Sequence, residues 1–146
     1  MKQAIVNSGV VLMCAAGLAA QTTVQMKDLP AAVRRTVLAE TKDAKIVHMV
    51  KETANGQPQF EIETLVNGKT RDLIILTNGH LEAVELELAP ADVPPAAMKV
   101  FSAGGGTVGK VESVKSGKPT YYEAIVEKDG KKTEITVDAN GKPVKP

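Results

Sequence analysis

Two stretches of the chain follow the same order of strands and turns, and this repetition limits the possible folds more than any other feature. Residues 60–79 read FEIETLVNGKTRDLIILTNG, and residues 122–141 read YEAIVEKDGKKTEITVDANG. The turn glycines Gly68 and Gly130 are 62 positions apart (130 − 68), as are the glycines that end the two stretches (141 − 79). Asn-Gly and Asp-Gly are typical of two-residue hairpin turns. The sequence therefore predicts two copies of a strand-turn-strand-turn unit.

The turns also predict which residues face each other across each hairpin. A register shifted by one residue would bury apolar side chains equally well in the first copy, but in the second copy it would set Val126 against Glu134. We therefore expect the unshifted register in both copies. It pairs Phe60 with Ile75 and Ile62 with Leu73, and, in the second copy, Tyr122 with Val137, Ala124 with Ile135 and Val126 with Thr133.

A helix is expected ahead of each copy. Asp28-Leu29-Pro30 and Asp92-Val93-Pro94 are typical of helix starts. An aspartate can accept hydrogen bonds from the free amides of the first turn, and a proline so near the start loses no helical hydrogen bond. The apolar positions of the two helices correspond at an offset of 64 (93 − 29), and they are Leu29, Val33 and Val37, then Val93, Ala97 and Phe101.

Further strands complete each unit. Residues 45–51 and 110–114 are rich in β-prone side chains and precede the two hairpins. After the first hairpin, Glu85 and Glu87 alternate with apolar residues, which predicts a fourth strand with an acidic, solvated face. The apolar residues of this strand are Val84, Leu86 and Leu88.

The predicted fold class is therefore α+β. We expect two tandem αβββ(β) repeats at residues 21–89 and 90–146, each a helix packed on an antiparallel sheet. Only residues 142–146 follow the second hairpin, so the last strand of the second repeat should be short or missing.

The N-terminus is typical of a secretory signal. Lys2 precedes a mostly apolar run at residues 10–20, and polar residues follow it. The run is shorter than the roughly 20 residues of a membrane-spanning helix, and no basic stop follows. We therefore expect a signal peptide at residues 1–20, cleaved after Ala19 or Ala20, rather than a membrane anchor. The mature protein is predicted to be periplasmic or secreted, with no membrane span.

Composition disfavours several classes of function. Without Lys2 the chain has 17 basic residues (18 − 1) and 17 acidic residues, so its charge does not favour nucleic-acid binding. Aromatic residues make up 3% of the chain, which disfavours a surface of aromatic anchors. Cys14 is the only cysteine, and Met13 in front of it disfavours a lipoprotein. The mature chain would then have no disulfide, thiol nucleophile or thiolate metal site.

No motif indicates catalysis, a cofactor or a metal. Residues 104–110 have the glycine and lysine spacing of a phosphate-binding loop, but Val111 stands where that loop needs Ser or Thr, and the stretch joins a helix to a strand. His48 and His80 have no second ligand at helical spacing and are interpreted as strand and turn residues. Paired strand carboxylates lack a sugar platform, and no serine lies in a Gly-x-Ser-x-Gly elbow. We therefore predict a protein that is not an enzyme.

The sheet face turned away from the helices is the candidate binding surface. It mixes charged side chains with Ile and Leu, a combination suited to a protein partner. The alternative is that these apolar residues pack between the two repeats. The candidate partner-binding residues are Glu61, Glu63, Asp72, Ile74, Leu76, Glu123, Ile125 and Lys132.

Several of these motifs together resemble the PepSY-like, β-lactamase-inhibitor-protein-like (BLIP-like) family of exported bacterial proteins. The resemblance covers nearly all of the mature chain. It implies tandem helix-on-sheet repeats that form a saddle, a sheet surface that grips a partner and, by analogy with PepSY domains, restraint of a peptidase. The aromatic-rich, disulfide-braced contact surface of the true β-lactamase inhibitors has no match here. The motifs are Asp28-Leu29-Pro30-Ala31-Ala32-Val33, Phe60-Glu61-Ile62-Glu63, Val66-Asn67-Gly68-Lys69, Asn78-Gly79 and their second copy.

The leading hypothesis is an exported, non-enzymatic protein-binding module that restrains a peptidase or another envelope protein through the open sheet face. The alternative is a periplasmic sensor protein that binds a small ligand or a metal ion. A third hypothesis is an unrecognised hydrolase. A protein partner is expected, and the oligomeric state is left open.

Overall fold

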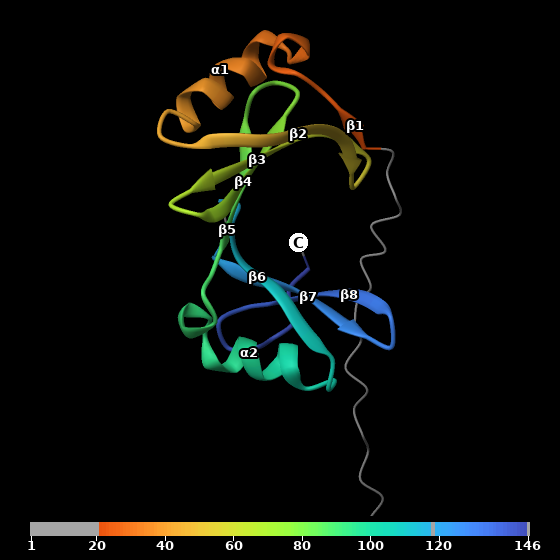
Figure 1. Ribbon diagram of the computed structural model, residues 1–146. Coiled ribbons are helices and arrows are strands. Elements are labelled where there is room, and N and C mark those ends of the chain that lie inside the picture. The colour runs from red at the N-terminus through yellow and green to blue at the C-terminus, as the bar shows by residue number, and fades with distance from the viewer. Residues whose placement is uncertain (1–20, 118, 146) are drawn as a thin grey trace, which may run out of the picture.

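The computed structural model describes residues 21–117 and 119–145, which form an α+β fold (Figure 1). The predicted signal peptide at residues 1–20 lies outside the described residues. Neither α-helix in the described part has the length and apolar character needed to cross a bilayer. The helices are η1 (Met26–Asp28), α1 (Ala31–Glu40), η2 (Pro90–Asp92) and α2 (Pro95–Ser102), where η denotes a 3₁₀ helix. The strands are β1 (Thr22–Thr23), β2 (Lys45–Ala54), β3 (Gln57–Val66), β4 (Lys69–Leu76), β5 (Leu81–Glu87), β6 (Thr107–Lys115), β7 (Tyr121–Lys128) and β8 (Lys131–Val137).

All eight strands belong to one antiparallel sheet, in which each strand lies beside the next in the chain. The sequence predicted a helix on an antiparallel sheet in each half, and the structure joins the strands of both halves into a single sheet. The joint is the pairing of β5 with β6. The sheet curves, and both α-helices lie on its outer side (Figure 1). We call the helix-covered side the outer face and the opposite side the inner face.

The structure confirms the predicted hairpin register. Asn67 and Gly68 have φ values of 52° and 80°, and Asp129 and Gly130 have φ values of 52° and 75°. A type I′ turn requires positive φ at both central residues, and Asn, Asp and Gly tolerate it best. The observed pairs include the five that were predicted, namely Phe60–Ile75 and Ile62–Leu73 between β3 and β4, and Tyr122–Val137, Ala124–Ile135 and Val126–Thr133 between β7 and β8.

Each α-helix covers an apolar core on the outer face. Leu86, expected on the apolar side of β5, is instead 39% exposed. The buried residues of the first core are Leu29, Val33, Val37, Phe60, Ile62, Leu73 and Ile75. Those of the second core are Val93, Ala97, Phe101, Val111, Ala124, Val126 and Val137. The helical positions predicted from the offset of 64 therefore lie in the two cores.

The helix starts differ from the predicted caps. Asp28 ends η1, and its Oδ2 accepts a hydrogen bond from the Gln25 amide at 3.2 Å. Pro30 is the N-cap of α1, and Pro94 is the N-cap of α2. Neither proline makes a side-chain capping hydrogen bond. The prediction that Asp28 caps α1 is therefore wrong, because Asp28 belongs to the preceding 3₁₀ turn and Pro30 takes the N-cap position.

Turn glycines set how closely the helices approach the sheet. A Cβ on Gly79 would lie 2.8 Å from the backbone carbonyl of Ala32, and the Thr36 hydroxyl donates a hydrogen bond to the Gly79 oxygen at 2.6 Å. Gly141 lies equally close to α2, since a Cβ there would be 2.8 Å from the Ala96 oxygen. A residue with a side chain would push each helix away from the sheet.

The chain returns only briefly to the sheet after β8. Val137 forms an isolated bridge with Pro143, and the Val144 amide donates to the Thr136 oxygen at 3.2 Å. Within the described residues this short contact stands where the first half has β5, in agreement with the expectation of a short or missing strand.

Candidate functional site

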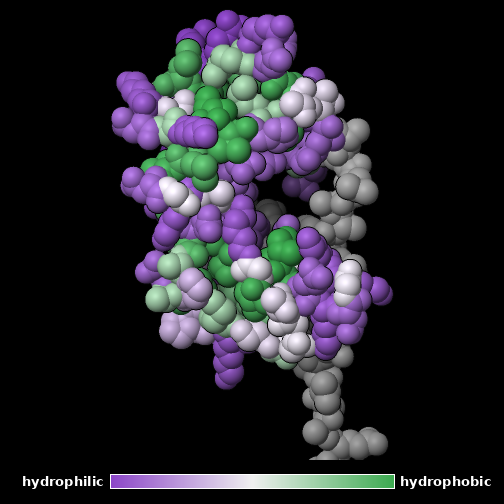
Figure 2. All heavy atoms as spheres, in the orientation of Figure 1, coloured by the Kyte–Doolittle hydropathy of each residue, from purple (hydrophilic) through white to green (hydrophobic). Residues whose placement is uncertain are grey.

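The inner face gathers carboxylates from six neighbouring strands, β3 to β8. Strand residues alternate between the two faces of a sheet. The apolar residues of each strand therefore lie in the cores on the outer face, and the acidic residues next to them in the chain lie on the inner face. Figure 2 shows hydrophilic side chains bordering the hollow between the two halves. We call the group the acidic face, and its members are Glu61, Glu63, Asp72, Glu85, Glu112, Glu123 and Glu134.

Several of these carboxylates stand directly opposite one another. The sheet register pairs Asp72 with both Glu63 and Glu85, and it pairs Glu112 with Glu123. Like charges in directly opposed positions destabilise a sheet.

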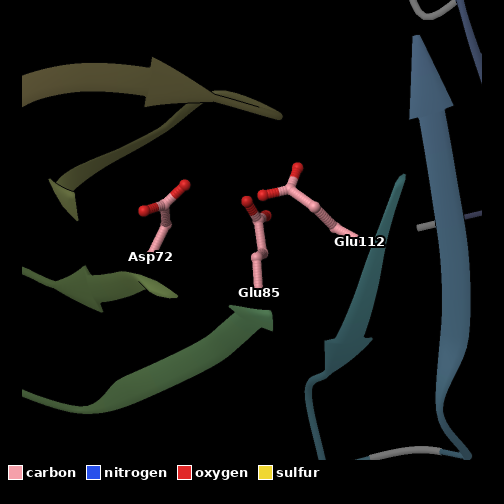
Figure 3. A group of neighbouring side chains, drawn as sticks. All are labelled: Asp72, Glu85 and Glu112. Atoms are coloured by element: carbon pink, nitrogen blue, oxygen red, sulfur yellow. The ribbon is translucent and has the colours of Figure 1, made fainter. Parts of the chain in front are cut away.

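Asp72, Glu85 and Glu112 form the centre of the acidic face (Figure 3). One carboxylate oxygen of each lies within 4.8 Å of the corresponding oxygens of the other two. The three side chains come from the adjacent strands β4, β5 and β6 and point toward one another. Asp72 is only 3% exposed. We call these three residues the carboxylate cluster.

Lys110 of β6 places a positive charge beside the carboxylate cluster. Its Nζ lies 2.7 Å from Glu112 Oε1 and 3.5 Å from Asp72 Oδ2. The contact with Glu112 is an ion pair rather than a well-aligned hydrogen bond, and Asp72 Oδ1 is buried without a hydrogen-bond partner among the described residues. One ammonium therefore compensates the three carboxylates only in part.

Burial raises the pKa values of five carboxylates of the acidic face, and repulsion between neighbouring carboxylates adds to the effect. The pKa of Glu85 rises to about 8 from the ordinary 4.5. The pKa values of Glu61 and Glu123 rise to about 7. Near neutral pH, part of this face therefore carries protons that a bound cation would displace.

The pKa values of Asp72 and Lys110 show how incomplete their pairing is. A carboxylate in a strong ion pair has a lowered pKa. Burial instead raises the pKa of Asp72, because it outweighs the attraction of Lys110. Burial by itself would lower the pKa of Lys110, but the Glu112 and Asp72 carboxylates raise it. The single ammonium therefore offsets the burial of Asp72 only in part.

Three depressions lie near this face. A polar depression of 170 Å³ is lined by residues that include Glu61 and His48. A smaller depression of 30 Å³ lies beside Glu112 and Lys110. The largest of the three, at 260 Å³, is mainly apolar and lies beside Tyr121 rather than at the carboxylate cluster. Of these three depressions, only the smallest is lined by a member of the carboxylate cluster, Glu112.

All eight predicted partner-binding residues lie on the inner face. Ile74 is only 9% exposed and packs with Ala83, Val114 and Tyr121 where the two halves meet, as the alternative interpretation expected for it. Ile125 is 37% exposed. The others are Glu61, Glu63, Asp72, Leu76, Glu123 and Lys132.

Sequence reasoning missed two members of the carboxylate cluster. The alternation in β5 predicts a solvated face for Glu85, whereas the structure half-buries this residue, and no sequence motif points to Glu112. The alternation in β5 and β6 places both residues on the inner face, which is the one signal available. Their proximity follows from the pairing of β5 with β6, which no turn in the sequence specifies.

No family model matches the sequence, and no curated protein matches it. Several solved structures from Bacteroides species have a similar fold. One from Bacteroides eggerthii, described provisionally as a periplasmic protein, has 16% identity and a TM-score of 0.64, and the alignment covers 80% of this chain and 86% of that chain. A DUF2874 family protein from Bacteroides uniformis has 18% identity and a TM-score of 0.62, with coverage of 80% and 86%.

A BLIP-like protein from Bacteroides fragilis is also similar, at 18% identity and a TM-score of 0.57, with coverage of 80% of this chain and 84% of that chain. At this level of identity the likeness concerns the fold. The chain therefore shares the BLIP-like fold that its sequence motifs resemble.

Proposed function

We propose that this protein is an exported, non-enzymatic binding module of the periplasm, and that its inner face holds a protein partner through a basic segment. The observation that carries the proposal is the acidic face, a group of seven among the carboxylates on the side of the sheet that the helices leave uncovered. Restraint of a peptidase, which the family resemblance implies, is one form that such binding could take.

Charge complementarity favours a basic partner segment. Directly opposed carboxylates such as Glu112 and Glu123 repel each other, and a lysine or arginine placed between them would relieve that repulsion. Ile125 lies on the same face and is 37% exposed, so it offers an apolar contact beside the charges. A partner with alternating basic and apolar side chains would match both features.

Two observations support export to the periplasm. Residues 1–20 have the charged, apolar and small-residue order of a signal peptide. The structural neighbour from Bacteroides eggerthii is described provisionally as periplasmic, at 16% identity.

The proposal includes a tandem αβββ(β) repeat at residues 21–89 and 90–146. Equal hairpin registers in β3–β4 and β7–β8 support it. So do the equivalent contacts of the two turn glycines, Gly79 with α1 and Gly141 with α2. A repeated unit would account for a binding face that continues across both halves.

A photo-crosslinking amino acid tests the binding face in the protein's own cells. It is placed at Ile125 on the inner face, with Leu38 on α1, which is 56% exposed, as the matched outer-face control. We expect a discrete protein adduct from position 125 only, and a crosslinked partner peptide with net positive charge. Glu134, directly opposite Ile125 in the sheet, supplies the charge control.

Glu134→Lys should reduce the adduct at position 125, and so should added salt, because the attraction is electrostatic. Equal adducts from both positions, an acidic partner peptide or an adduct indifferent to Glu134→Lys would each contradict the proposal.

A further inference from the structure

The geometry of the carboxylate cluster matches that of oxygen ligands around one cation. Three atoms that lie within 4.8 Å of one another share a central point no farther than about 2.8 Å from each (4.8/√3). Calcium binds carboxylate oxygens at about 2.3–2.6 Å, and magnesium requires about 2.0–2.1 Å in near-ideal octahedral geometry. The cluster therefore needs only a few tenths of an ångström of closure for calcium and a larger contraction for magnesium.

A second observation points independently to a ligand. The Asp72 side chain is 5% exposed and is aimed into the cluster (Figure 3). Its Oδ1 is buried without a hydrogen-bond partner among the described residues. Buried polar atoms are almost always satisfied, and a native exception calls for an explanation such as an ion. A cation bound by Asp72 Oδ1 would satisfy this atom.

The charge balance indicates the valence of that cation. Fully ionised, the three carboxylates contribute −3 and Lys110 contributes +1, which leaves a formal charge of −2 (−3 + 1) at the centre of the sheet. A divalent ion neutralises this charge. The ligands are all carboxylate oxygens, which suit hard cations better than zinc or copper.

We propose that Asp72, Glu85 and Glu112 bind a divalent cation, with calcium preferred, and that the ion ties the two halves of the sheet together. Asp72 and Glu85 belong to the first half, whereas Glu112 belongs to the second. The halves meet where β5 and β6 pair, from Val84–Lys115 to Glu87–Glu112. An ion held from both sides of this joint would set the curvature of the inner face.

Calcium titration of the purified mature chain tests the proposal without any partner, so it stands or falls separately from the proposed function. The protein is treated with a chelator and then titrated with calcium or magnesium chloride at constant ionic strength, with calorimetry and thermal unfolding as readouts. We expect calcium to raise the Tm, with a Kd of roughly 10⁻⁴–10⁻³ M, as in extracellular calcium modules. No calcium response, or an equal response to magnesium, would overturn the proposal.

Two variants with equal changes of charge localise the site. Asp72→Asn replaces a charged carboxylate ligand with a neutral amide and should fold well, because it removes a buried charge. It should weaken calcium binding by about tenfold or more. Glu61→Gln removes a carboxylate of the same face outside the cluster and should leave calcium binding nearly unchanged. Equal effects of both variants would show general screening by the acidic face and would overturn the site.

Lys110→Met tests the competition between the ammonium and the ion. Lys110 contacts two of the proposed ligands, Asp72 and Glu112, so its removal should tighten calcium binding. It should also make the Tm more dependent on calcium. Without the Lys110 ammonium, the bound ion is left to neutralise the negative charge of the three carboxylates. Unchanged or weaker calcium binding would mean that the ion does not occupy this position, which would overturn the proposal.

Discussion

The stability of the protein should fall as the pH rises from about 4.5 to about 7, and Glu61→Gln should reduce that fall. Burial, with repulsion from Glu52 and Asp72, raises the pKa of Glu61 from the ordinary 4.5 to about 7. Between these values the folded chain holds a proton at Glu61 that the unfolded chain releases. The contribution of Glu61 to stability therefore decreases with pH across this window and is level above it. Glutamine keeps the shape of the side chain and removes its charge.

The size of the effect follows from the change in pKa. A rise from 4.5 to about 7 corresponds to about 3 kcal/mol, at 1.36 kcal/mol per pKa unit. Glu61 is only half-buried, and solvent screening reduces the expected effect to about 1–2 kcal/mol. We expect Glu61→Gln and wild type to unfold with similar free energies at pH 4. At pH 8 the variant should be more stable by about 1–2 kcal/mol.

Denaturant unfolding followed by circular dichroism between pH 4 and pH 8 measures this difference. Chelator is present throughout, so that cation binding does not contribute. Glu82→Gln is the control, because Glu82 lies in the same sheet but its side chain is 49% exposed. Its stability relative to wild type should not follow the same pH dependence. A constant or decreasing advantage of Glu61→Gln from pH 4 to pH 8 would refute the assigned burial of this carboxylate.

Two further predictions test the packing that positions the inner face. Gly79→Ala should destabilise the fold by about 2–5 kcal/mol, because the new side chain combines a positive φ with a clash against Ala32. Gly68→Ala also has a positive φ but meets open space, so it should destabilise the fold by about 1–2 kcal/mol. Equal losses in denaturant unfolding would contradict the close helix contact. Phe101→Ala should lose about 3–5 kcal/mol because Phe101 is fully buried, and Leu38→Ala, at 56% exposure, should lose less than about 1 kcal/mol. Similar Tm values for these two variants would contradict the second core.

The strand pairs within each hairpin follow from the sequence because their causes are local. Asn67-Gly68 and Asp129-Gly130 specify the turn type, and a two-residue turn determines every pair along its two strands. Period-two alternation then sorts the side chains between the two faces of the sheet. These short-range rules predicted the hairpin registers and the apolar helix positions. They were insufficient for the helix starts, where a 3₁₀ turn replaced the expected cap at Asp28.

The joint between the halves was decided only by the tertiary structure. Glu85 and Glu112 are 27 positions apart (112 − 85), and α2 lies between them in the chain. Alternation places each residue on the inner face, but no turn specifies that β5 pairs with β6. The pairing also buries Ile74. The sequence alone was compatible with either a partner contact or packing between the repeats for this residue.

The members of the acidic face were therefore visible in the sequence as separate acidic residues, whereas the carboxylate cluster was not. Burial, pKa and proximity depend on which groups surround a side chain, and here those groups come from strands of both halves. Local patterning determines the direction in which a strand residue points. Long-range strand pairing determines what that residue meets, and it brings Asp72, Glu85 and Glu112 within reach of a single ion.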